Sequence, residues 1–162
     1  MVEVRIRLRV NGEDHEVDVP IGKLLRDVLR EDLGLLSVRY GCDTGDCGMC
    51  TILLDGKPVR SCLLIAPQAE GHEIWTLEGL KDRDPVVQTI IEAFAQAHAT
   101  QCGYCSPAFI LITKYFLERN PNPTREEVRK AVSAALCRCT GYKQIVDGVL
   151  LAARMLREGG VV

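Results

Sequence analysis

The sequence predicts an α+β fold in two parts, a small half that contains a β-sheet and a second half made only of helices. In much of the first 80 residues apolar residues alternate with polar ones, a period typical of strands with one buried face. From residue 84 onward they recur every three or four residues, as on one face of a helix. Each half also contains four of the eight cysteines. We therefore expect two domains, residues 1–80 and residues 81–162.

The length and composition are those of an ordinary globular protein. A chain of 162 residues, with 47% hydrophobic and 26% charged residues, can bury one sizeable core or two small ones. Its formal net charge is -2 and its lysines and arginines are scattered, which argues against nucleic acid or an acidic membrane surface as a partner. It has no run of about 18 uncharged apolar residues, and its start, MVEVRIRLRV, lacks the apolar core of a secretory signal. We expect a cytoplasmic protein without a membrane span.

The first predicted elements are a β-hairpin and a helix. Residues 2–10 alternate strictly, Asn11-Gly12 is a strong hairpin turn signal, and the alternation resumes at residues 16–19. A helix is predicted after Pro20 and ends at Gly34. Its apolar stripe consists of Leu24, Leu25, Val28 and Leu29.

Turn signals and a helix cap organise the middle of the chain. Residues 51–63 predict two strands around an Asp55-Gly56 turn, and residues 72–80 predict a last strand. Asp84 then has the character of an N-cap, with Pro85 at the first helical position. These signals predict the first helix of the second half.

Three more helices are predicted beyond residue 100. The second opens with Ser106-Pro107 and ends at the turn over residues 120–123. Thr124 and Glu127 have the spacing of a capping box at the start of the third. The fourth runs from about residue 142 to residue 157.

The eight cysteines indicate metal binding. A reducing compartment removes the usual reason for keeping so many cysteines, which is a framework of disulfides. The first set lies in YGCDTGDCGMC with the spacing C-x4-C-x2-C, and its fourth member follows after eleven residues, as in plant-type two-iron, two-sulfide ferredoxins. The glycines at 41, 45 and 48 permit a tight loop that aims backbone N–H groups at sulfur. The predicted ligands are Cys42, Cys47, Cys50 and Cys62.

The second set of cysteines lies in the helical half. One C-x2-C pair precedes the second helix and one C-x-C pair precedes the fourth, where the positive ends of the helix dipoles favour an anionic cluster. The candidate ligands are Cys102, Cys105, Cys137 and Cys139. Spacing alone is less diagnostic here, because two cysteine pairs equally make a four-thiolate zinc site. A zinc site is the alternative for the first set as well, although its spacing favours the cluster.

The chain resembles the small iron-sulfur subunits of molybdenum hydroxylases related to xanthine dehydrogenase, aldehyde oxidoreductase, carbon monoxide dehydrogenase and 4-hydroxybenzoyl-CoA reductase. The resemblance is carried by YGCDTGDCGMCTILLDGKPVRSCL, TQCGYCSPAFI and ALCRCTGYKQI, and it covers residues 4–157. All eight cysteines fall on positions that are iron ligands in this family.

The resemblance implies a β-grasp, ferredoxin-like N-terminal domain and a C-terminal four-helix domain, each with one 2Fe-2S cluster. It implies electron transfer between a molybdenum-pterin cofactor on a large subunit and FAD on a medium subunit, within a heterotrimer whose dimerisation is left open. The helical domain's cluster would lie nearest the molybdenum. Gln101 and Cys139 match family positions that contact the pterin, and Cys139 would also be an iron ligand.

We therefore expect the electron-transfer subunit of a molybdenum-containing oxidoreductase. No substrate site is expected in this chain, because paired carboxylates, a nucleophile-base pair and a phosphate-binding loop are all missing from the sequence. The main alternative is a free-standing ferredoxin-type electron shuttle whose helical half only docks. A structural zinc module is the third hypothesis.

Overall fold

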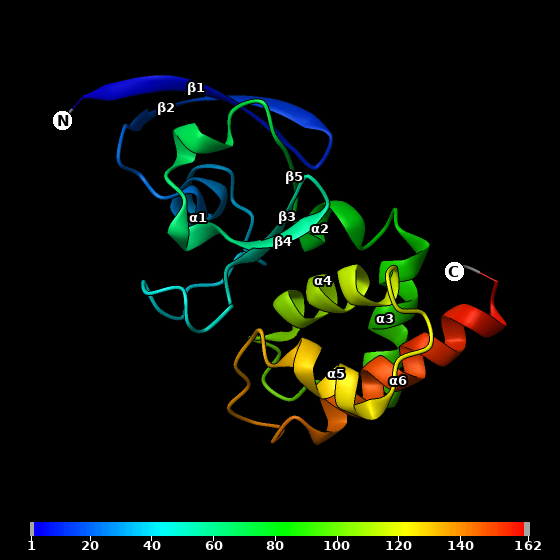
Figure 1. Cartoon of the computed structure of the whole chain (residues 1–162). Coiled ribbons are helices and arrows are strands. Elements are labelled where there is room, and N and C mark those ends of the chain that lie inside the picture. Colours follow the sequence, from blue (N-terminus) through cyan, green and yellow to red (C-terminus); the bar gives the residue numbers. More distant parts are fainter. Residues whose placement is uncertain (1, 161–162) are drawn as a thin grey trace.

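A computed structural model, which describes residues 2–160, has the predicted α+β fold, with a five-stranded sheet followed by helices (Figure 1). The strands are β1 (Glu3–Val10), β2 (Glu13–Pro20), β3 (Thr51–Leu54), β4 (Lys57–Arg60) and β5 (Glu73–Trp75). Their order in the sheet is β2-β1-β5-β3-β4. β1 and β5 run parallel and all other neighbouring strands are antiparallel, so the first and last strands of this half lie side by side in the middle.

Both predicted hairpin turns form. Asn11 and Gly12 have φ values of 54° and 86°, and Asp55 and Gly56 have values of 48° and 74°. Two successive positive φ values are the signature of the turn whose twist matches that of paired strands. On β1 the buried residues alternate with exposed ones, as the sequence predicted.

The predicted helix after Pro20 is shorter and less regular than expected. It begins as helix α1 (Leu25–Asp27) and continues as a π-helix over Val28–Asp32. The N–H of Leu33 donates to the carbonyl of Val28, five residues back, so this last turn is wider than an α-turn. Of the predicted apolar stripe, Leu25, Val28 and Leu29 are buried.

The strand predicted over residues 72–80 forms only as β5, and the chain then turns into helix α2 (Leu77–Leu80). The backbone N–H of Thr76 donates to Asn11 Oδ1 at 2.9 Å. Asn11 Nδ2 in turn donates to Thr76 Oγ1 at 3.1 Å. The prediction was wrong beyond Trp75 because a side chain from the distant hairpin turn takes the N–H that would have continued the strand ladder.

The helical half contains α3 (Pro85–Gln96), α4 (Ser106–Leu117), α5 (Arg125–Val132) and α6 (Lys143–Glu158). The predicted caps form: Asp84 Oδ1 accepts from the N–H groups of Val86 (2.9 Å) and Val87 (3.1 Å). Thr124 and Glu127 exchange hydrogen bonds in a capping box. None of the helices within residues 2–160 combines the length and the apolar character that crossing a membrane requires.

Buried apolar side chains form two cores. One lies between the sheet and α1, with Ile6, Leu8, Leu25, Leu29, Ile52 and Ile74 among its members. The other lies among α3 to α6 and also includes Cys47, Met49 and Leu53, which belong to the sheet half. The domain ranges 1–80 and 81–162 stay a prediction, and residues 1 and 161–162 lie outside the described residues. The shared core shows that the two halves are packed together, not merely linked.

The contribution of the Thr124 cap of α5 to the stability of the helical half can be tested by mutation. Thr124→Ala removes the hydroxyl that accepts from the Glu127 N–H, and we expect the free energy of unfolding to fall by about 1 kcal/mol. Thr89→Ala on α3 is the matched control, because its exposed hydroxyl bonds only a carbonyl of its own helix. Thermal unfolding followed by circular dichroism should show a lower midpoint for Thr124→Ala alone. Equal midpoints for the two variants would contradict the assigned cap.

Candidate iron-sulfur sites

The first cysteine set is assembled from a loop and the end of a strand pair. Cys42, Cys47 and Cys50 lie on the loop before β3, and Cys62 lies in a 3-10 turn directly after β4. The N–H of Cys47 donates to Cys42 Sγ at 3.4 Å. Cys50 lies close enough to Cys62 to help raise the pKa of its thiol. The structure thus brings together all four cysteines that were predicted as ligands of this site.

The loop around this set is built for close approach to sulfur. A Cβ on Gly41 would lie 2.7 Å from Cys47 Sγ, so no larger residue fits there without a shift of the sulfur. The Met49 N–H points at Cys47 Sγ at 3.5 Å. This is the arrangement expected of a loop that surrounds an anionic group with backbone donors.

Hydrogen-bond donors and burial shift the pKa values of the thiols in the first cysteine set in opposite directions. Backbone N–H groups of Cys47 and Thr44 lower the pKa of Cys42 to about 6. Burial raises the pKa of Cys62 to about 11 and also raises that of Cys47. Donors aimed at sulfur stabilise negative charge on it, which iron-bound thiolates also require.

The second cysteine set lies between two loops of the helical half. Cys105 is the N-cap residue of α4, and Cys137 and Cys139 lie in the loop before α6. The Sγ atoms of Cys139 and Cys102 are 3.6 Å apart. Cys137 lies close enough to Cys105 to help raise the pKa of its thiol. The four predicted ligands of this site are therefore also brought together.

Two cysteines of this second site are exposed to solvent and the other two are partly buried. Cys102 and Cys139 are exposed, whereas Cys105 and Cys137 are partly buried. Burial raises the pKa of Cys105 to about 12, whereas the Tyr104 N–H lowers that of Cys102. Gln101, the predicted pterin contact, is exposed beside Cys102. The exposed edge thus carries both residues that were predicted to contact a partner's cofactor.

The sulfur atoms of each site lie in pairs and not around one point. Within residues 2–160, no three side chains of histidine, cysteine, aspartate or glutamate converge so as to hold a single metal ion. A two-iron, two-sulfide cluster takes two cysteines for each iron, whereas a structural zinc takes four donors around one ion. The eight cysteines provide the four thiolates that each of two such clusters takes.

The two sites are joined through the backbone. The N–H of Leu136, the residue before Cys137, donates to the carbonyl of Cys47 at 2.9 Å. Gly48 permits this contact, because its φ is 71° and a Cβ there would lie 2.4 Å from the Ala134 carbonyl oxygen. The Tyr104 hydroxyl also donates to the Tyr40 carbonyl, from the second site to the first. Two hydrogen bonds thus connect the loops that carry the cysteines.

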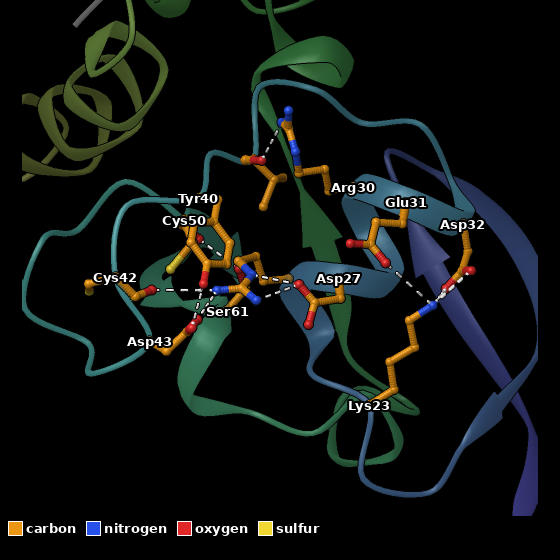
Figure 2. A network of polar contacts seen from close by, with 12 residues as sticks. Lys23, Asp27, Arg30, Glu31, Asp32, Tyr40, Cys42, Asp43, Cys50 and Ser61 are labelled. Atoms are coloured by element: carbon orange, nitrogen blue, oxygen red, sulfur yellow. Dashed lines mark hydrogen bonds and ion pairs between the residues drawn. The ribbon is translucent and has the colours of Figure 1, made fainter.

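Arg26, which was not predicted as a site residue from the sequence, lies beside the first site. Its side chain is only 5% exposed and pairs with Asp27 and Asp43. It also contacts the Cys42 carbonyl at 3.4 Å and the Tyr40 ring. Figure 2 shows three residues of this loop, Tyr40, Cys42 and Asp43, close together beside Asp27. The only signal available beforehand was an arginine placed next to the apolar stripe of a helix, which by itself predicts an exposed side chain.

The comparisons with known proteins agree with this geometry. Residues 8–76 match the family model described as a 2Fe-2S iron-sulfur cluster binding domain, and residues 76–150 match the 2Fe-2S binding domain. The chain is 46% identical to the nicotinate dehydrogenase small FeS subunit of Eubacterium barkeri, over 94% of this chain and 96% of that protein. It is 42% identical to the xanthine dehydrogenase iron-sulfur-binding subunit of Escherichia coli O157:H7, over 91% of this chain and 92% of that protein.

A solved structure extends this likeness to the fold. Quinoline 2-oxidoreductase from Pseudomonas putida 86 contains a chain that matches with a TM-score of 0.87 and 42% sequence identity. The match covers 97% of this chain and 98% of that one. The chain therefore belongs to the family of small 2Fe-2S electron-transfer subunits of molybdenum hydroxylases related to xanthine dehydrogenase and aldehyde oxidoreductase.

Proposed function

We propose that this chain relays electrons between a molybdenum-pterin cofactor on a large subunit and FAD on a medium subunit of a heterotrimeric oxidoreductase. The observation that supports the relay most is the backbone hydrogen bond of 2.9 Å between Leu136 and Cys47, which joins the two cysteine sites. A 2Fe-2S cluster, when bound, stores and releases one electron at a time. The chain's own part is to hold two such groups at a fixed separation.

The proposed ligands divide by half. The N-terminal site uses Cys42, Cys47, Cys50 and Cys62, and the helical site uses Cys102, Cys105, Cys137 and Cys139. The carbonyl of Cys47, a proposed ligand of the N-terminal site, accepts a hydrogen bond from Leu136. Leu136 directly precedes Cys137, a proposed ligand of the helical site. This short connection suits a relay between the two sites.

The exposed edge of the helical site supports the placement of the partners. Gln101, Cys102 and Cys139 are exposed there, and a partner that covers this edge would shield the site from water. We therefore propose that this edge faces the molybdenum-bearing subunit, with Gln101 and Cys139 in contact with the pterin. The N-terminal site then faces the medium FAD subunit.

Two further proposals concern the cell and the assembly. All eight cysteines are free thiols, which suits a reducing compartment, and we place the chain in the cytoplasm. Whether two heterotrimers pair into a dimer can be measured by analytical ultracentrifugation of the purified complex. The alternative of a free-standing ferredoxin shuttle is not supported, because the similar proteins are named as subunits of larger dehydrogenases.

Spectroscopy and metal analysis provide the direct test of the two sites. After reduction with dithionite, the protein should show two distinct 2Fe-2S signals by electron paramagnetic resonance and contain about four iron atoms per chain. A colourless protein with stoichiometric zinc would reject the proposal. A Gln101→Ala variant should keep both signals, because Gln101 is not a proposed iron ligand.

A further inference from the structure

Arg26 is the one charged residue among the buried polar residues of the part of the chain that the structure describes, and it is 4% exposed. It lies on α1, and its guanidinium contacts the carbonyl of Cys42 in the first cysteine loop. A buried guanidinium is costly unless it is paired and hydrogen-bonded. The contacts of Arg26 must therefore compensate for its burial.

Arg26 contacts its neighbour Asp27 on α1 and the start of the first cysteine loop, residues 40–43. Its Nε donates to Asp27 Oδ1 at 2.7 Å, and its Nη1 donates to the Asp43 carboxylate and to the Cys42 carbonyl (3.4 Å). The guanidinium lies 4.2 Å from the centre of the Tyr40 ring, a stacked cation–π contact. The Tyr40 hydroxyl closes the network by donating to Asp43 Oδ2 at 2.6 Å.

This network places opposite charges at different depths. The Arg26 side chain is 5% exposed, whereas the side chains of its two partners, Asp27 and Asp43, are 23% and 52% exposed. Water therefore screens the carboxylate of Asp43 more than the guanidinium. A reduced 2Fe-2S cluster carries one more negative charge than an oxidised one, so a weakly screened positive charge nearby stabilises the reduced form.

We propose that Arg26 is a positioning residue that anchors the Cys42 segment and raises the reduction potential of the N-terminal cluster. This inference rests on the proposed assignment of Cys42, Cys47, Cys50 and Cys62 as ligands. Asp43 acts against it, because its carboxylate lies on the residue next to Cys42 and partly cancels the positive charge. Asp27 also pairs with the guanidinium, so three side chains balance charge beside the N-terminal site. We expect them to leave the potential of the helical cluster unchanged.

The test is a redox titration of the assembled complex, followed by electron paramagnetic resonance of each cluster. Arg26→Gln should lower the midpoint potential of the N-terminal cluster. Arg26→Lys keeps the positive charge, so the potential in this variant should lie close to that of the unmodified protein. Asp43→Asn should raise the same potential. The midpoint of the helical cluster serves as an internal reference and should stay unchanged in every variant.

Arg30→Gln is the matched control. Arg30 lies on the same helical segment and braces the same stretch of chain through the carbonyls of Leu36 and Val38, both at 3.0 Å. If bracing alone mattered, Arg30→Gln would shift the N-terminal potential as Arg26→Gln does, which would overturn the proposal. An unchanged potential in Arg26→Gln would overturn it as well.

The outcomes separate this inference from the proposed function. If Arg26→Gln fails to assemble the N-terminal cluster, Asp43→Asn decides, and the absence of an upward shift in that variant would refute the charge-balance role. If the unmodified protein has no N-terminal cluster, the proposed ligand assignment itself fails. Two intact clusters with unresponsive potentials would reject only the inference about Arg26.

Discussion

Replacing Cys105 by serine is expected to abolish turnover of the assembled complex. Cys105 is the N-cap residue of α4 and its thiol lies against that of Cys137, so its loss leaves the helical site with three thiolates. No other cysteine can take its place, because the remaining four belong to the N-terminal site. Cys137→Ser should have the same effect. Steady-state assays with the natural electron acceptor would measure the loss.

The same experiment includes its own controls. Ser106→Ala, in the same turn as Cys105, removes only a hydroxyl bonded to Thr100 and should keep both clusters and activity. Cys47→Ser should leave reduction of molybdenum by substrate intact and block reduction of the flavin. Stopped-flow spectroscopy of each centre separates these steps. Normal flavin reduction in Cys47→Ser would refute the proposed order of the two sites.

Replacing Gly48 by alanine is expected to separate the two sites and slow electron transfer between them. A Cβ at this position would lie 2.4 Å from the Ala134 carbonyl oxygen and 2.9 Å from Ala135 Cα, and both are backbone atoms that cannot rotate away. The clash would push apart the segments joined by the hydrogen bond from Leu136 to Cys47. Stopped-flow measurement should show the first reduced cluster appearing normally and the second appearing more slowly.

Gly56→Ala is the matched control for this effect. Gly56 has a φ of 74°, close to the 71° of Gly48, but nothing lies within 4 Å of a Cβ built there. Both variants therefore carry a similar backbone strain of roughly 1–2 kcal/mol, and only Gly48→Ala adds the clash. If the two variants transfer electrons at equal rates, the close approach of the halves at Gly48 does not matter for the relay.

Local chemistry accounts for most of the fold that could be predicted. The turn at Asn11-Gly12 and the caps at Asp84 and Thr124 depend on residues a few positions apart, and all of them form. The strand predicted over residues 72–80 stops early because Asn11, far away in sequence, bonds to Thr76. Contacts of that kind leave no periodic signal in the sequence.

The number of cysteines, their spacing and the helices that follow them could all be read from the amino-acid order alone. The spacing predicted the first set of cluster ligands, because its pattern depends mainly on positions close together in one loop. The assignment of the second set also depended on the family resemblance. Two features required the folded chain: the hydrogen bond between Leu136 and Cys47 that joins the cysteine loops, and the burial of Arg26 against one of these loops. Both features arise where segments distant in sequence pack together, and such packing depends on the whole chain.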